Sequence, residues 1–210
     1  MCFPFFSLLS KGEPEGTCKT SIANSHKMSS EKTEKIIYEN SEQKLNPIDL
    51  VIEFATKKSS AKGLNNHFLR VLAVLKDEFN VDDVDILTAA VLHDTLEDTD
   101  ATYNELEKVF SKTVADLVEE VSHPKNYNHE QKLEYYEKLK TISPKAKIIK
   151  LADFVDNLRN IIEMRKSDPQ SPYHNQYILW IRDFLNSCPE SNAKKIVFKL
   201  TQELEIFVMI

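Results

Sequence analysis

Apolar residues recur three and four positions apart from about residue 46 onward, as in Leu151, Val155, Leu158 and Ile162. This spacing places the apolar side chains on one stripe of an α-helix, which can then pack against a shared core. No alternating pattern typical of a β-strand competes with it. The sequence therefore predicts an all-α fold with helices near residues 47–58, 65–79, 83–96, 102–110, 112–121, 129–141, 144–165, 172–187 and 192–208.

Helix-start signals agree with this periodicity. In "NPID", Asn46 is a candidate N-cap and Pro47 occupies the first helical position, and "SPKA" repeats the device with Ser143 as the cap. Thr102 and Glu105 in "TYNE" have the spacing of a capping box, in which each side chain satisfies the backbone N–H of the other.

The first 45 residues differ from the rest. They mix Gly, Pro, Ser, Lys and Glu without helical periodicity, which is typical of a segment too polar to form a core. We expect a disordered tail over residues 1–45 and one helical domain over 46–210. The opening "MCFPFFSLLS" is apolar but short, and the sequence leaves open whether residues 1–27 are a targeting segment. No stretch approaches the ~20 apolar residues of a membrane span, so no membrane partner is expected.

The last sixteen residues, "KIVFKLTQELEIFVMI", are unusually apolar. Two interpretations remain: the segment closes the core, which we favour, or it pairs with a second copy of the chain. The oligomeric state is therefore unknown, and a homodimer stays open.

Composition narrows the function. The chain has 210 residues and a net charge of −6, which argues against a general nucleic-acid binder, because affinity for phosphate backbones comes from clustered lysine and arginine. Cys2, Cys18 and Cys188 are widely spaced and form no CxxC pair, which favours a reducing compartment, and we expect a cytoplasmic protein. Gly63 is the only glycine beyond the tail, so a glycine-rich phosphate loop is absent. An anionic substrate must be met by local charge or by a metal ion.

The stretch "AAVLHDTLEDTD", residues 89–100, carries the candidate chemistry. On a continuous helix each residue turns by about 100°, so His93, Asp94, Glu97 and Asp98 would share one side. One imidazole and three carboxylates on a half-buried face are costly unless a cation compensates them. The pattern favours a metal site.

Two further stretches offer metal ligands, His67 in "LNNHFLRVL" and Asp153 in "KLADFVDNLRN". Asn157 lies four residues after Asp153 and shares its face of the helix. Two imidazoles and two carboxylates form a mixed nitrogen and oxygen site, which suits Mn²⁺, Fe²⁺ or another octahedral ion better than a structural zinc.

These residues follow the H…HD…D order of the HD phosphohydrolase superfamily. "LHDTLEDTDATYNELEKVFSKTVADLVEEVS" with "KIIKLADFVDNLRN" resembles the (p)ppGpp hydrolase domain of the RelA/SpoT family, above all its small stand-alone animal homologues, from about residue 47 to 185. The resemblance implies an HD-domain helical bundle. It also implies one Mn²⁺ held by His67, His93, Asp94 and Asp153, hydrolysis served by Glu97 and Asp98, and a nucleotide substrate bound by Lys57, Asn157, Arg159 and Tyr177.

The chain departs from the family pattern near the expected substrate. Lys57 replaces an arginine and Ser59 a histidine, while Phe154 and Asp156 replace a basic residue and a histidine or tyrosine. Arginine grips phosphate in two parallel contacts, whereas lysine offers a point charge, so substrate preference is open.

The expected activity is metal-dependent hydrolysis of the 3′-pyrophosphate of (p)ppGpp, giving GDP or GTP and pyrophosphate. Two alternatives remain: an HD-type phosphohydrolase acting on another nucleotide phosphate, and a nucleotide-binding protein that has lost hydrolysis. Because the family's nucleotidyltransferase domain is not in this sequence, we do not expect synthesis of the nucleotide.

Other polar residues have plainer interpretations. His123, His129 and His174 fit no motif and are expected at the surface. Lys150 is expected to be a solvated charge, and Tyr177 is equally compatible with a pocket and with the core.

Overall fold

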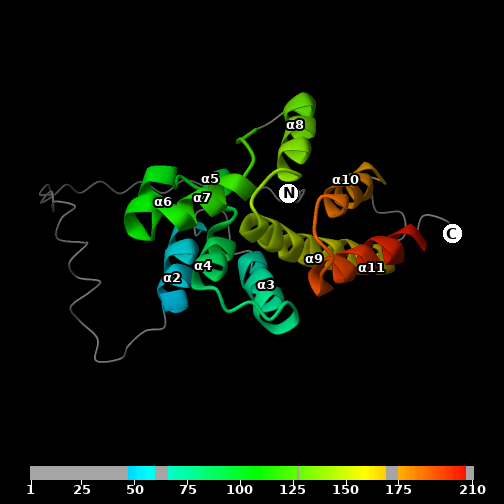
Figure 1. Cartoon of the computed structure of the whole chain (residues 1–210), viewed down its shortest axis with the longest axis horizontal. Helices are drawn as coiled ribbons and strands as arrows, with labels where there is room; N and C mark the ends of the chain where they lie inside the picture. The colour runs from blue at the N-terminus through cyan, green and yellow to red at the C-terminus, as the bar shows by residue number, and fades with distance from the viewer. Residues whose placement is uncertain (1–46, 60–65, 127, 169–174, 207–210) are drawn as a thin grey trace, which may run out of the picture. The chain divides into compact units, whose positions relative to one another are not determined.

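The structure is a computed structural model that describes residues 47–59, 66–126, 128–168 and 175–206 (Figure 1). Within these ranges every regular element is helical and there is no strand, which confirms the all-α fold. The expected tail over residues 1–45, the Asn46 cap and His174 lie outside the described residues.

The helices follow one another along the chain with short connections. In order they are α2 (Pro47–Ser59), α3 (His67–Ala73), η1 (Val74–Glu78), α4 (Val84–Leu92), α5 (Thr95–Asp98), α6 (Tyr103–Val109), α7 (Lys112–Val121), α8 (His129–Leu139), α9 (Pro144–Ser167), α10 (Asn175–Asn186) and α11 (Asn192–Ile206).

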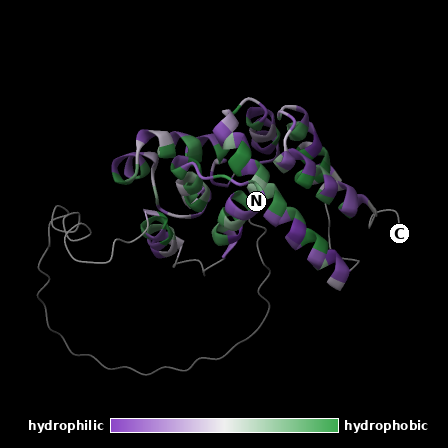
Figure 2. Cartoon of the chain, turned by 60° about the horizontal axis from the view of Figure 1, so that its bottom comes forward, coloured by the Kyte–Doolittle hydropathy of each residue, from purple (hydrophilic) through white to green (hydrophobic). Residues whose placement is uncertain are grey.

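The long helix α9 is the centre of the packing. It contacts α3, η1, α4, α7 and α11, and α4 in turn contacts α2, α3 and α7 (Figure 1). Ile149, Val155 and Leu158 of α9 are fully buried or nearly so. Figure 2 shows both hydrophobic and hydrophilic residues on most helices, as expected of amphipathic helices around a common core. Residues of α3, α4 and α9 can therefore meet in the interior.

Several predicted helix starts are confirmed. Pro47 begins α2, and Ser143 caps α9 by accepting a hydrogen bond from the Ala146 N–H. Thr102 caps α6 in the same way, but the Glu105 carboxylate accepts from Lys58 on α2. The predicted capping box is therefore observed only in its Thr102 half.

Two predicted helices differ from the structure in detail. The helix expected over 65–79 is present as α3 and continues as a π-helical turn at Val74–Glu78, whereas the helix expected over 83–96 is interrupted at His93 and Asp94. The Thr95 hydroxyl donates to the Leu92 carbonyl at 2.6 Å, which satisfies a carbonyl at the end of α4. The interruption changes the direction in which the acidic side chains after it point.

The C-terminal helix closes the core over its described part. Val197, Thr201 and Leu204 of α11 are buried, and α11 packs on α9. This agrees with the favoured interpretation of the apolar C-terminal segment. None of the helices in the described part of the chain is both long and apolar enough to cross a membrane.

Candidate functional site

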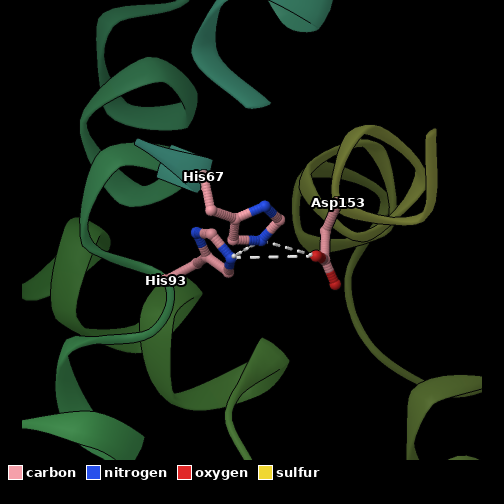
Figure 3. A group of neighbouring side chains, drawn as sticks. All are labelled: His67, His93 and Asp153. Carbon is pink, nitrogen blue, oxygen red and sulfur yellow. Dashed lines mark hydrogen bonds and ion pairs between the residues drawn. The ribbon is translucent and has the colours of Figure 1, made fainter. Parts of the chain in front are cut away.

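Three separate helices deliver polar side chains to one buried point. His67 begins α3, His93 directly follows α4, and Asp153 lies in the middle of α9; all three point toward one another (Figure 3). His67 Nε2 lies 3.1 Å from His93 Nε2 and 3.0 Å from Asp153 Oδ1, and His93 Nε2 lies 3.8 Å from the same oxygen. All three residues are buried. Residues distant in the sequence thus converge as the motif predicts.

The other nitrogen of each imidazole is already committed. His67 Nδ1 lies 2.6 Å from Asp156 Oδ2, and His93 Nδ1 lies 2.8 Å from the Ala90 carbonyl oxygen. Both partners accept hydrogen bonds, so each Nδ1 carries the proton and each Nε2 can offer a lone pair. Such hydrogen bonds orient histidine ligands in protein metal sites.

Asp156 is the buried carboxylate that orients His67. It also accepts from Arg70 Nε at 2.6 Å, from Arg70 Nη2 at 3.0 Å and from Asn160 Nδ2 at 3.0 Å. Burial opposes the charged carboxylate, but the hydrogen bonds to His67 and Arg70 outweigh it and lower the pKa of Asp156. Asp156, which departs from the family pattern, therefore orients a candidate metal ligand.

Asp94 lies at the edge of this cluster and is half-buried. Its Oδ1 is 3.1 Å from His93 Nε2 and its Oδ2 is 3.9 Å from His67 Nε2. Burial raises the pKa of the Asp94 carboxyl, but the attraction of the two imidazoles outweighs it and the pKa is lowered.

The charges of the cluster favour a cation. Burial alone would lower the pKa of His67, but hydrogen bonds to Asp153 and Asp156 outweigh it and raise the pKa to about 10. The pKa of His93 is raised as well, because the attraction of Asp94 outweighs its burial. The carboxylates thus stabilise positive charge between them, whether protons or a metal ion supply it.

A buried ion pair adjoins the cluster. Lys150 Nζ lies 2.7 Å from Asp153 Oδ2, and both side chains are almost fully buried. The ammonium also lies over the rings of Tyr135 and Phe154, at 5.6 and 5.4 Å from their centroids. Lys150 is therefore a structural partner of Asp153, and the expectation of a solvated charge was wrong.

The donor set fits a single divalent ion. Ligands about 2.1 Å from an ion lie about 3 Å apart when they are at right angles, and up to about 4.2 Å when opposite. The three separations within the cluster, 3.0, 3.1 and 3.8 Å, fall in this range. His67, His93 and Asp153 thus form a candidate metal site whose geometry does not identify the ion.

Glu97 points to a different partner. Because the helix is interrupted before it, its carboxylate turns to the segment after α7: Oε1 accepts from the His123 backbone N–H at 2.9 Å, and Oε2 lies 2.7 Å from His123 Nε2. The prediction that His93, Asp94, Glu97 and Asp98 share one face of a continuous helix was therefore wrong. His123 is half-buried against Glu97 and is not a plain surface histidine.

An open cavity of about 840 Å³ lies beside this turn. Both Glu97 and Asp98 line it. The remaining lining residues come from α2, the loop after α5, α6 and the segment after α7: Phe54, Lys57, Lys58, Thr99, Asp100, Glu105 and Lys125. Lys58 is held there by Asp100 at 3.1 Å and Glu105 at 2.9 Å. The cavity is large enough for a small-molecule ligand.

The remaining predicted substrate residues have different surroundings. Asn157 donates to Asp153 Oδ1 at 2.6 Å and so belongs to the cluster. Arg159 is exposed and forms a two-pronged ion pair with Glu78, at 2.6 and 2.8 Å. Tyr177 is buried on α10 with its ring against Phe154, and burial raises its pKa well above the usual range.

Sequence reasoning missed supporting residues for which a partial signal existed. Lys150 lies three residues before Asp153 and shares its helix face, which could have identified the pair. Arg70 lies three residues after His67, but its contact with Asp156 joins two helices and is not visible in either alone. Nothing in the sequence indicated that His123 would meet Glu97.

Known proteins resemble this chain over the same region. The HD domain family model matches residues 50–177. The Drosophila melanogaster protein named guanosine-3′,5′-bis(diphosphate) 3′-pyrophosphohydrolase MESH1 is 36% identical over 129 residues, covering 61% of this chain and 72% of the relative. The human protein of the same name is 43% identical over 97 residues, covering 46% of this chain and 54% of the relative.

A solved structure also resembles this chain. A metazoan orthologue of SpoT, described as hydrolysing ppGpp, superposes with a TM-score of 0.66 and 26% identity, covering 78% of this chain and 98% of the other. The resemblance is confirmed that was inferred from the HD motif, His93–Asp94, and from the LAD motif, Leu151–Asp153.

Proposed function

This chain belongs to the HD domain family, and we propose that it is a metal-dependent hydrolase that removes the 3′-pyrophosphate of (p)ppGpp, releasing pyrophosphate and GDP or GTP. One observation carries the proposal. This chain, which is 36% identical to a relative named for the activity, brings His67, His93 and Asp153 together in the order of the family motif.

We propose Mn²⁺ as the ion, held by His67, His93, Asp94 and Asp153. The mixed nitrogen and oxygen donors favour such an ion over a structural zinc. When bound, the ion would lower the pKa of water and neutralise charge on phosphoryl oxygens. The chain's contribution is orientation, since the fixed Nδ1 protons of both histidines present each Nε2 to the same point.

Glu97 and Asp98 are the proposed catalytic acids. Both line the cavity, and they follow Asp94 by three and four residues. A carboxylate at this position can orient the attacking water or accept its proton. The leaving group is the ribose 3′-oxygen, so the nucleotide must bind with its 3′-phosphorus between the metal ligands and this pair.

The cavity is the proposed nucleotide site. Lys57 lines it and supplies positive charge, and Asn157 borders the metal ligands on the opposite helix. Arg159 and Tyr177 remain proposed contacts by family position. Engagement of Arg159 requires that its ion pair with Glu78 open, and engagement of Tyr177 requires that α10 move its ring from the core.

A second candidate function is hydrolysis of another nucleotide phosphate. It is favoured by the cavity's charge, because Lys58 is neutralised by Asp100 and Glu105 and no arginine lines the cavity in the described part of the chain. Without a two-pronged phosphate clamp, selectivity for a doubly pyrophosphorylated nucleotide would rest on Lys57 and the metal.

The test uses the purified full chain with Mn²⁺ and ppGpp, and measures released pyrophosphate and GDP. We expect turnover by the native protein and none by His93→Ala or Glu97→Ala. His129→Ala is the matched control, because His129 is exposed at the start of α8 and away from the lining. Turnover of other nucleotides without ppGpp hydrolysis would favour the second function. Binding without any turnover would identify a protein that has lost hydrolysis.

A further inference from the structure

We propose that His123 is a positioning residue that fixes the Glu97 carboxylate for the reaction. The inference rests on the proposed function of Glu97. It assigns a role to a residue that belongs to neither the HD nor the LAD motif.

His123 contacts both oxygens of one carboxylate. Its backbone N–H donates to Glu97 Oε1 at 2.9 Å, while ring Nε2 lies 2.7 Å from Oε2. The Glu97 side chain is 9% exposed and that of His123 is 14% exposed, so water competes little for these contacts. Two contacts from one residue fix both the position and the rotation of the carboxylate plane.

The ring must act as a donor toward Glu97. A carboxylate oxygen without a proton can only accept a hydrogen bond, so the ring nitrogen that faces it must supply the proton. A bare Nε2 lone pair could not approach a carboxylate oxygen to 2.7 Å, because two acceptors repel. Nε2 therefore donates a hydrogen bond to Oε2 of Glu97.

The segment that carries His123 is itself tied to the site. The Val121 carbonyl accepts from the Tyr135 hydroxyl at 2.6 Å. The Ser122 hydroxyl donates to the Val118 carbonyl at 2.7 Å and lies 3.3 Å from the His93 carbonyl. The His123 ring also packs edge-on against Tyr135, with 5.5 Å between centroids. Consecutive residues after α7 thus lie against a proposed metal ligand, His93, and a proposed catalytic acid, Glu97.

The expected consequence is on turnover. A carboxylate that swings freely still allows the nucleotide to bind, but it aligns less often with the water or proton that it serves. Loss of the ring donor should lower kcat by about 10-fold and change KM little, because supporting hydrogen bonds of this kind typically contribute 10–100-fold. The backbone N–H contact remains and limits the loss.

The experiment compares His123→Gln with His123→Met in the full chain. The two side chains are similar in length and flexibility, but only glutamine can donate a hydrogen bond to Glu97. We expect His123→Gln to keep kcat within about 3-fold of the native value and His123→Met to lose about 10-fold, with similar KM. His129→Ala controls for loss of an exposed histidine. Thermal unfolding and Mn²⁺ binding of each variant check that the fold and the metal site are intact.

Equal kcat for both variants, whether native or reduced, would overturn the inference, because the donor would then not matter. A second measurement does not depend on activity. In ¹⁵N NMR, the His123 ring signals should shift when Glu97 is replaced by Gln, and unchanged signals would overturn the contact itself. A native protein that hydrolyses no nucleotide, but whose His123 signals respond to Glu97→Gln, would refute the proposed function and leave the contact standing.

Discussion

The site has two acidic arms that resemble each other in sequence and differ in structure. The turn arm, His93–Asp98, belongs to an interrupted helix, whereas the helix arm, Lys150–Asn157, lies within continuous α9. On the helix arm, residues three and four apart stay together, so Lys150 and Asn157 both contact Asp153. On the turn arm, Glu97 does not join His93, and its carboxylate contacts His123 after α7 instead. The continuous helix therefore gathers its polar side chains around Asp153, whereas the acidic side chains of the interrupted helix contact different residues.

The arms also differ in how they orient the histidines. His93 is oriented by the carbonyl of Ala90, a backbone group of α4 that no side-chain substitution removes. His67 is oriented by Asp156, a side chain of the helix arm. The orientation of His67 is therefore open to mutation, and that of His93 is not.

The largest expected effect breaks the helix arm. Asp153→Ala removes a proposed metal ligand and leaves the buried Lys150 ammonium without its partner, which should destabilise the fold by about 3–5 kcal/mol and abolish metal binding. Chemical denaturation measures the stability. The double variant Lys150→Met with Asp153→Leu should recover most of the stability but no activity. Equal losses in the single and double variants would show that the ion pair is not the source.

Metal addition tests whether the two arms act together. At an Mn²⁺ concentration of about 100 times Kd, binding should stabilise the native state by about 2.7 kcal/mol. For a chain of this size this corresponds to a rise in Tm of roughly 5–10 °C. His93→Ala and Asp153→Asn should each abolish the rise, and a chelator should reverse it. A rise that survives either substitution would place the ion elsewhere.

Asp156→Asn tests whether the orientation of His67 depends on a side chain. The amide can turn its oxygen to His67, but it weakens the two-pronged contact with Arg70, so the ring should be less firmly held. We expect metal affinity to fall by about 10-fold, the lower end of the range for such supporting residues. Isothermal titration of Mn²⁺ measures it. Glu163→Gln, an exposed change later on α9, is the control and should not alter Kd.

The smallest effect concerns the bend of the turn arm. Thr95→Val keeps the side-chain shape but removes the hydroxyl that donates to the buried Leu92 carbonyl, with an expected cost of about 0.5–1.5 kcal/mol. Thr141→Val removes a similar bond to the Lys138 carbonyl at an exposed site and should cost less. Equal losses by thermal unfolding would indicate that the bend does not depend on Thr95.

Local patterns predicted the helices well. The apolar periodicity of α9 and the caps at Ser143 and Thr102 were readable because helix formation depends on residues within a few positions. The convergence of His67, His93 and Asp153 could be anticipated from the family resemblance. The break at His93 could not, because the Thr95 hydrogen bond that closes it competes with an otherwise helical sequence.

Polar contacts between residues far apart in the chain could not be predicted from the sequence. Asp156 looked like a departure from the family pattern, and its partner Arg70 lies 86 positions away. His123 and Glu97 are 26 positions apart and come together where α7 packs against α4, the helix before the turn arm. Such contacts follow from how helices pack, which periodicity alone does not specify.

The buried Lys150 limits how many protons the empty cluster takes up, because its positive charge already balances one of the carboxylates. Asp94, Asp153 and Asp156 bring three negative charges, Lys150 and Arg70 bring two positive ones, and the raised pKa of His67 adds a proton as a third. The empty cluster is therefore close to neutral. Because a metal ion binds imidazole nitrogens that carry no proton, we expect metal binding to release protons and to weaken as the pH falls.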